Sequence, residues 1–141
     1  RPDKYAEAFV DGWFDTGDMG WLDDEGFLYV EGREGDMISS GGENVFPDEI
    51  ESVYGEEDAI AQISVVGIPD DRWGAVPVAF VMFKGEQTMD FETLRNFGRD
   101  RLAHYKVPVR FFETETFPRT ASGKIQRHKL REQLTTAQEI K

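Results

Sequence analysis

The sequence predicts a small α+β domain of roughly 100 residues that follows a shorter N-terminal segment. After residue 36, the local patterns of strand and helix alternate in the order β-α-β-β-α-β-loop-α. The chain has 141 residues, of which 39% are hydrophobic, and this is enough to build one core. Low-complexity tracts and internal repeats are absent from the sequence, so we expect a compact globular protein.

Composition and charge exclude several classes of protein. The net charge of −12 argues against non-specific nucleic-acid binding, and the absence of cysteine excludes disulfides and thiolate metal sites. The longest apolar run, residues 75–83, is shorter than the about 20 residues of a membrane-spanning helix. No signal peptide is recognisable, so we expect a cytoplasmic protein without a transmembrane segment. Because the chain opens with Arg1-Pro2, we expect either upstream processing or a piece of a longer protein.

The first half of the chain predicts short elements separated by turns. Residues 1–34 are rich in glycine, aspartate and aromatic residues, which favours brief strands and tight turns. Within this segment, residues 27–30 predict one half-buried strand. Met37-Ile38 indicates another strand, and residues 39–42 indicate a turn or hairpin. Pro47 then predicts the start of a short helix, because proline is favoured at a first helical position.

The second half predicts the main sheet and two helices. Three strands are indicated at residues 61–70, 75–84 and 109–114 by their β-branched and aromatic content. Asp90 is typical of an N-cap, and we expect its helix to continue to about Leu102. A loop at 117–124 precedes a closing helix at 125–137. The expected fold is therefore a short β-hairpin plus a three-stranded sheet flanked by helices.

The loop at residues 118–124, PRTASGK, concentrates positive charge in an acidic chain. It is not a Walker loop, because Pro118 stands where the first glycine is needed and Ile125 replaces the hydroxyl residue after the lysine. The small residues before Lys124 let the backbone approach a ligand, and a lysine there can place a mobile charge on a phosphate or carboxylate. These residues alone are equally compatible with a solvated helix start.

Other charged residues near this loop receive a simpler interpretation. We expect Arg127, Lys129 and Arg131 to be ordinary charge on a solvated helix surface. His104 and His128 have no partner at metal-ligand spacing, so we interpret both as structural or surface residues and predict no metal site. No Ser-His-Asp pattern indicates nucleophilic catalysis.

Two glycine-containing turns leave alternatives open. The turn at residues 15–18 has the sequence DTGD, and an aspartate there commonly bonds its own backbone. Asp18 could instead accept two hydrogen bonds from a ribose diol, as acidic residues do in dinucleotide sites. Gly41-Gly42 is similarly compatible with hairpin geometry or with close passage of a ligand.

Three segments taken together resemble the adenylate-forming family: GWFDTGD at residues 12–18, GREGDMISSGGENVFPDEIE at 32–51 and PRTASGK at 118–124. This family contains acyl-CoA synthetases, adenylation domains of peptide synthetases and firefly-type luciferases. The resemblance covers essentially the whole chain. It implies that residues 35–141 form the small mobile C-terminal domain of such an enzyme, preceded at 1–34 by a tail of the large N-terminal AMP-binding domain.

The resemblance also implies roles for individual residues. Asp18 would hold the ribose hydroxyls of ATP, and Arg33 would also contact the nucleotide. Gly35, two residues later, would be the hinge between the domains, where glycine rotates freely but holds neither conformation by a side-chain contact. Lys124 would be the catalytic lysine of adenylation, withdrawn when the small domain rotates for thioester formation.

The opposite face of the domain would then receive CoA. The resemblance places the pantetheine tunnel at five residues, Ser40, Gly41, Gly42, Glu43 and Trp73. Some relatives use basic residues near the Tyr-Lys-x-Pro segment for the CoA nucleotide. Here Val107 and Val109 occupy two of these positions, which leaves Lys106 and Arg110 as candidates.

The resemblance therefore predicts part of an ATP-dependent acid–CoA ligase that makes an acyl-AMP intermediate. Its substrates would be a small carboxylic acid, ATP and CoA, with Mg²⁺ bound to ATP mainly by the large domain, which would also be the partner of this chain. The isolated fragment is expected to be inactive. One alternative is an adenylation domain that loads a carrier-protein phosphopantetheine. Another is a non-catalytic nucleotide-binding module, against which the presence of Asp18, Arg33 and Lys124 argues.

Overall fold

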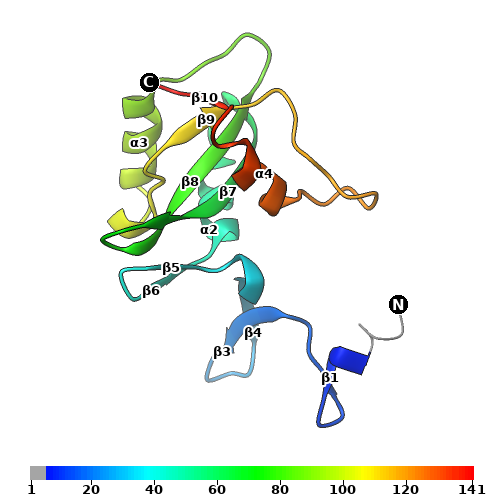
Figure 1. The fold of residues 1–141 in the computed structure, drawn as a ribbon. Helices are drawn as coiled ribbons and strands as arrows, with labels where there is room; N and C mark the ends of the chain where they lie inside the picture. Colours follow the sequence, from blue (N-terminus) through cyan, green and yellow to red (C-terminus); the bar gives the residue numbers. More distant parts are fainter. Residues whose placement is uncertain (1–5) are drawn as a thin grey trace.

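The N-terminal part of the chain forms two separate ribbons. The computed structural model describes residues 6–141, and Figure 1 shows these ribbons below a compact domain. The first ribbon pairs β1 (Phe9–Val10) with β2 (Trp13–Phe14), and the second pairs β3 (Asp18–Leu22) with β4 (Leu28–Arg33), both antiparallel. A 3₁₀ turn, η1 (Glu34–Asp36), leads from β4 into the domain.

The domain is built on a six-stranded mixed sheet in which β8 is the hub. The long strands β7 (Ile60–Asp70) and β8 (Gly74–Phe83) form an antiparallel hairpin, and β9 (Phe111–Glu113) runs parallel to β8. The short hairpin of β5 (Ile38–Ser40) and β6 (Glu43–Val45) joins the same sheet through Ser40 and Gly74. The predicted hairpin and three-stranded sheet are thus confirmed, but they form one sheet.

Helices cover both faces of the sheet. α2 (Pro47–Tyr54) and α3 (Phe91–Arg99) pack on one face, and α4 (Arg127–Gln133) packs on the other (Figure 1). Alternate residues of the strands supply the two cores: Val65 and Phe111 point toward α2 and α3, whereas Val66 and Phe112 point toward α4. This alternation explains why the strands read as continuous apolar runs in the sequence.

Two of the three predicted helix starts are confirmed, the start of the closing helix is wrong, and both later helices are shorter than expected. Asp90 caps α3 by accepting a hydrogen bond of 2.8 Å from the Thr93 backbone N–H, and Pro47 begins α2. α3 ends at Arg99, and a second 3₁₀ turn, η2 (His104–Lys106), follows. The closing helix does not begin at residue 125, because Ile125 forms a β-bridge with Arg119.

One strand was not predicted, and one expectation about burial is wrong. β10 (Gln138–Glu139) adds an edge strand beside β9, so the sheet domain continues to Ile140. Residues 27–30 were expected to be half-buried, yet all four are exposed, because among the described residues the domain packs on the β3–β4 ribbon only near Gly32. Within residues 6–141, no helix is both long and apolar enough to span a membrane.

Candidate functional site

Asp18 and Arg33 lie directly opposite each other on β3 and β4. Arg33 Nε is 2.9 Å from Asp18 Oδ1, and Arg33 Nη1 donates a 2.8 Å hydrogen bond to the Thr16 carbonyl. Asp15, not Asp18, is the turn residue, since its Oδ1 accepts from the Gly17 N–H at 2.8 Å. Asp18 is therefore held by an arginine and remains accessible, with 36% of its side chain exposed.

The loop that carries Lys124 is closed by its own hydrogen bonds. The Thr120 N–H donates to the Lys124 carbonyl at 2.8 Å, and the Gly123 N–H donates to the Thr120 carbonyl at 2.9 Å. Gly123 has a φ of 87°, a conformation that favours glycine and tightens the turn just before the lysine. Lys124 is exposed, and its ammonium group has no ion-pair partner in the part of the chain that the structure describes.

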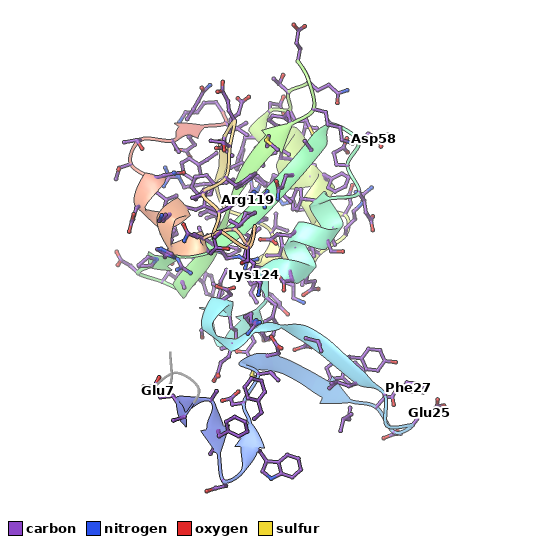
Figure 2. All side chains as sticks on the ribbon, turned by 90° about the vertical axis from the view of Figure 1, so that its right-hand side faces the viewer. Glu7, Glu25, Phe27, Asp58, Arg119 and Lys124 are labelled. Carbon is purple, nitrogen blue, oxygen red and sulfur yellow. The ribbon has the colours of Figure 1, made fainter. Side chains whose placement is uncertain are left out.

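Arg119 fixes this loop to the sheet. Its Nη1 donates to the Gly123 carbonyl at 2.8 Å, and its Nη2 donates to Gln62 Oε1 on β7 at 2.6 Å. Figure 2 shows Arg119 and Lys124 on the face of the domain that is turned toward the viewer. The arginine thus holds the loop backbone while the lysine side chain stays free to reach an anion.

Arg127 is not ordinary surface charge, and the expectation for this residue is wrong. Only 17% of its side chain is exposed, and its guanidinium contacts Asp36 at 2.7 Å, Asp48 at 3.0 Å and Glu51 at 2.9 Å. Its Nε also donates to the Val65 carbonyl at 3.2 Å. Lys129 and Arg131 are exposed as expected. No sequence pattern identifies these partners, because Asp36 lies 91 positions before Arg127.

A groove of about 640 Å³ lies between the β5–β6 turn, the β7–β8 turn and α3. Four of the five predicted tunnel residues line it: Ser40, Gly41, Glu43 and Trp73. Gly42 is not among the lining residues. The wall formed by Val107, Pro108 and Val109 faces them, so the groove has an apolar floor suited to an uncharged chain.

A glycine is required at position 41 because the Trp73 ring packs directly against its backbone. Gly41 has a φ of 61°, and a Cβ atom there would lie 2.9 Å from Trp73 Cε3. The Gly41 N–H also donates to the Trp73 carbonyl at 2.8 Å. Gly42 has a φ of 90°, but a Cβ atom there would meet nothing within 4 Å. The first glycine therefore admits the indole ring, and the second serves the turn.

The two candidates for the CoA nucleotide, Lys106 and Arg110, are already neutralised. Lys106 Nζ is 2.6 Å from a Glu49 carboxylate oxygen, and Arg110 Nη2 is 2.7 Å from a Glu139 carboxylate oxygen. The hydrogen bonds that Arg110 donates to the Glu139 carboxylate raise the pKa of the Arg110 guanidinium above its ordinary value. Both cations are therefore committed to neighbouring carboxylates.

Arg95 and Arg99, which the sequence interpretation missed, line the groove instead. Arg95 is 3.8 Å from Glu92, a long ion pair, and Arg99 has no ion-pair partner within residues 6–141. Their spacing of four residues places them on one face of α3, as helix geometry requires. This spacing was visible in the sequence, but only the fold shows that the face borders a groove.

Gly35 lies in the middle of η1. A Cβ atom at this position would meet nothing within 4 Å, and the residue is not in the left-handed region. The observed conformation is thus open to any side chain. Among the described residues no group of three or more His, Cys, Asp or Glu side chains could hold a metal ion.

Comparison with known proteins gives consistent matches along the whole chain. The family model described as the AMP-binding enzyme C-terminal domain matches residues 49–124. The 2-succinylbenzoate–CoA ligase of Listeria monocytogenes is 54% identical over 130 residues, which cover 92% of this chain and 27% of that enzyme. The same-named ligase of Bacillus velezensis is 48% identical over 132 residues. This chain thus spans about a quarter of the length of the curated relatives it matches.

Solved structures of enzymes of the same kind match this chain as well. The o-succinylbenzoate CoA synthetase of Bacillus subtilis, in complex with its acyl-adenylate intermediate, superposes with a TM-score of 0.87 at 40% identity and is matched over 96% of this chain and 27% of its own. The ATP-bound enzyme MatB of Rhodopseudomonas palustris superposes with a TM-score of 0.83 at 32% identity, again over 96% of this chain and 27% of its own.

Proposed function

The chain belongs to the family of AMP-binding enzyme C-terminal domains, and from this we propose that it is the mobile domain of an ATP-dependent acid–CoA ligase. Residues 1–34 would be the end of the large domain and residues 35–141 the small domain. The names of the relatives at 46–54% identity favour 2-succinylbenzoate as the acid.

The observation that supports this proposal most directly is the separation of two specialised faces. The loop before α4 that carries Lys124 and the β5–β6 hairpin extend on opposite sides of the domain (Figure 1), and the turn of that hairpin lines the groove together with Trp73. One face offers a mobile cation, and the other offers an apolar groove bordered by arginines. A two-step reaction in which the domain presents each face in turn requires this arrangement.

In the first step, a carboxylate oxygen of the acid attacks the α-phosphorus of ATP, and pyrophosphate leaves with its bonding electrons. Lys124 would stabilise the negative charge that develops on the phosphate oxygens. Asp18 would accept hydrogen bonds from the ribose hydroxyls, with Arg33 holding its carboxylate in place. Mg²⁺ would arrive with ATP and neutralise phosphate charge at the large domain.

In the second step, the CoA thiolate attacks the acyl carbon and AMP leaves, which gives the thioester. The pantetheine arm would lie in the groove between Trp73 and the wall at Val107 and Val109. Arg95 and Arg99 would face the phosphates at the nucleotide end of CoA, since neither is committed to a close carboxylate. Lys106 and Arg110 are not proposed for this role, because Glu49 and Glu139 already pair with them.

The proposal is tested by Lys124→Ala in the full-length enzyme. Removing one preorganised electrostatic group typically costs about 10²–10³ in rate, so formation of acyl-AMP from 2-succinylbenzoate and ATP should fall by that factor. Supplied with synthetic acyl-AMP and CoA, the same variant should form thioester at nearly the wild-type rate. Lys129→Ala is the matched control, because Lys129 is an exposed cation on the same segment.

Three outcomes would count against the proposal. Unchanged adenylation in Lys124→Ala would remove the lysine from the chemistry. An equal loss in both half-reactions would show that the two faces are not specialised. Transfer of the acyl group to a carrier-protein phosphopantetheine, but not to CoA, would identify the enzyme as a carrier-loading ligase.

A further inference from the structure

The short turn η1 between β4 and the domain is fixed on both sides. Hydrogen bonds to the β3–β4 ribbon fix its N-terminal side, and an ion pair fixes its domain side. On the N-terminal side, the Glu34 N–H donates to the Gly17 carbonyl at 3.0 Å, and Arg33 binds Asp18 and the Thr16 carbonyl. The chain up to residue 34 is therefore tied to the β3–β4 ribbon.

On the domain side, the hold is an ion pair. Asp36 Oδ2 accepts a 2.7 Å hydrogen bond from Arg127 Nη1, at the first residue of α4. The Arg127 guanidinium is fixed in turn by both Glu51 oxygens, at 2.9 and 3.0 Å, and by the Val65 carbonyl. Asp36 is therefore tied to α2, β7 and α4 through one side chain.

Gly35 is the single residue between these two holds. A Cβ atom there would touch nothing, so no packing opposes a change of its backbone angles. The ribbon also contacts the domain where Phe46 covers Gly32, with 3.1 Å between a Cβ placed on Gly32 and Phe46 Cδ1. That contact lies outside the turn, whereas the two holds on the turn are hydrogen bonds made by residues 33, 34 and 36 themselves.

We infer that Arg127 is a positioning residue: through Asp36 it fixes the domain end of the linkage, so that rotation between the ribbon and the domain is confined to Gly35. Arg127 lies three residues after Lys124, so the same side chain ties the pivot to the base of the lysine loop. The inference rests on the proposed function and extends it: Arg127 would keep the Lys124 loop in a fixed position relative to Gly35 while the domain rotates.

The carboxylates around Arg127 keep its guanidinium charged and paired. Burial alone would lower the pKa of Arg127, but the charges of Glu51, Asp36 and Asp48 more than offset it, so its pKa lies above the ordinary value and the guanidinium stays charged. A partly buried cation with several carboxylates around it keeps its pairs when one partner is removed. Asp36→Asn therefore removes the charge of the ion pair at the linkage alone and leaves at most a neutral hydrogen bond, because Glu51 and Asp48 still hold Arg127.

The absence of cysteine from the sequence allows a direct measurement. Spin labels at Glu25→Cys and Asp58→Cys, both exposed and far apart at opposite ends of the molecule in Figure 2, report the orientation of the ribbon against the domain. Double electron–electron resonance on the 141-residue chain should show a clearly broader distance distribution in Asp36→Asn. The Met37 N–H, which donates to the Glu34 carbonyl at 3.2 Å, should exchange about tenfold faster.

Asp48→Asn is the matched control, because Asp48 binds the same arginine at 3.0 Å but lies on α2 outside the turn. Its distribution should stay as narrow as that of the wild type. Arg127→Lys should broaden the distribution, since a point charge cannot contact three carboxylates in the geometry of a guanidinium. Unchanged widths in Asp36→Asn and Arg127→Lys, or equal broadening in Asp48→Asn, would overturn the inference. None of these readouts uses catalytic activity, so the inference can fail while the proposed reaction stands.

Discussion

The backbone at Gly41 and the side chain of Trp73 together set one wall of the groove. The left-handed conformation of Gly41 turns the β5–β6 hairpin toward the β7–β8 turn, and the missing side chain lets the indole ring approach. Asp70 holds the opposite turn by accepting hydrogen bonds from the Arg72 and Trp73 N–H groups at 2.9 and 2.8 Å. The position of Trp73 thus depends on one glycine and one aspartate.

Gly41→Ala should be more destabilising than Gly42→Ala. Both substitutions place alanine in a left-handed conformation, which costs roughly 1–2 kcal/mol. Only the first also forces its Cβ atom against Trp73, so its unfolding free energy should fall further, and only its Trp73 indole N–H resonance should shift. Chemical denaturation and NMR spectra of the two variants measure this. Equal losses and equal spectra would show that the ring does not depend on Gly41.

Single residues were predictable from the sequence where the needed information is local. Asp90 as a helix cap and Pro47 as a helix start depend on three or four neighbouring positions, and both are confirmed. Arg127 could not be predicted, because its burial depends on Asp36 and Glu51, which lie far away in the sequence. The roles of Lys124, Asp18 and Gly35 stay predictions.

At the scale of elements, α3 packs against the core with one face and borders the groove with another. Leu94 and Phe97 face the core, and Arg95 and Arg99 border the groove. A helix separates such faces by its periodicity, so the charged residues can face a ligand without disturbing the packing. Arg95 and Arg99 supply the positive charge of the groove wall, and the one ion pair among the described residues that joins them to a carboxylate, Arg95 to Glu92, is long at 3.8 Å.

In the full-length enzyme, Arg99→Ala and Arg95→Ala should weaken the use of CoA and leave the use of pantetheine unchanged. Loss of one charged hydrogen bond should raise KM for CoA about tenfold, because such bonds contribute roughly 1.5–3 kcal/mol. Pantetheine lacks the nucleotide phosphates, so its KM should not change. Arg101→Ala is the control, since Arg101 donates to the Phe97 carbonyl and does not line the groove. Equal changes for both thiols would remove the arginines from phosphate binding.

The edge strand β10 should loosen in acid. The hydrogen bond from Arg110 lowers the pKa of the Glu139 carboxyl below its ordinary value. A lowered pKa in the folded state means that the pair stabilises β10 above the ordinary glutamate range, and that this contribution is lost as pH falls through the folded value. Protection of the Ile140 N–H, which donates to the Phe111 carbonyl at 2.9 Å, should therefore fall between about pH 6 and about pH 3 relative to the amides at the centre of β7 and β8.

Glu139→Gln separates this pair from other titrating groups. In that variant the Ile140 amide should be less protected at pH 6 and should show no further relative loss in acid. A pH dependence that survives the substitution would assign it to another carboxylate. No sequence pattern predicts this strand, because residues 138–139 are two polar or charged residues without alternation, and only pairing with β9 orders them.

At the scale of the whole molecule, the ribbons and the domain differ in what they bury. Every residue of β3 is exposed, and in β4 only Gly32 is buried. Trp13 is 82% exposed, and further large apolar side chains are exposed on the same segment: Phe14, Trp21, Leu22, Phe27 and Leu28. An apolar surface of this kind marks an interface, and under the proposed function the large domain would be its occupant.

In the monomeric chain, β3 and β4 should exchange their amide hydrogens much faster than β7 and β8. A two-stranded ribbon in water is marginal on its own, because too little apolar surface is buried to offset the entropy of ordering the chain. The long β7–β8 hairpin is instead sandwiched between both cores, so its amides should open only when the domain unfolds. Hydrogen exchange followed by mass spectrometry, repeated at several dilutions, measures both segments together.

In the full-length enzyme the same ribbon amides should become protected, because the large domain would cover their apolar side chains. Protection of the ribbon equal to that of β7–β8 in a chain shown to be monomeric would mean that the ribbon is stable by itself, and the apolar surface would then need no partner.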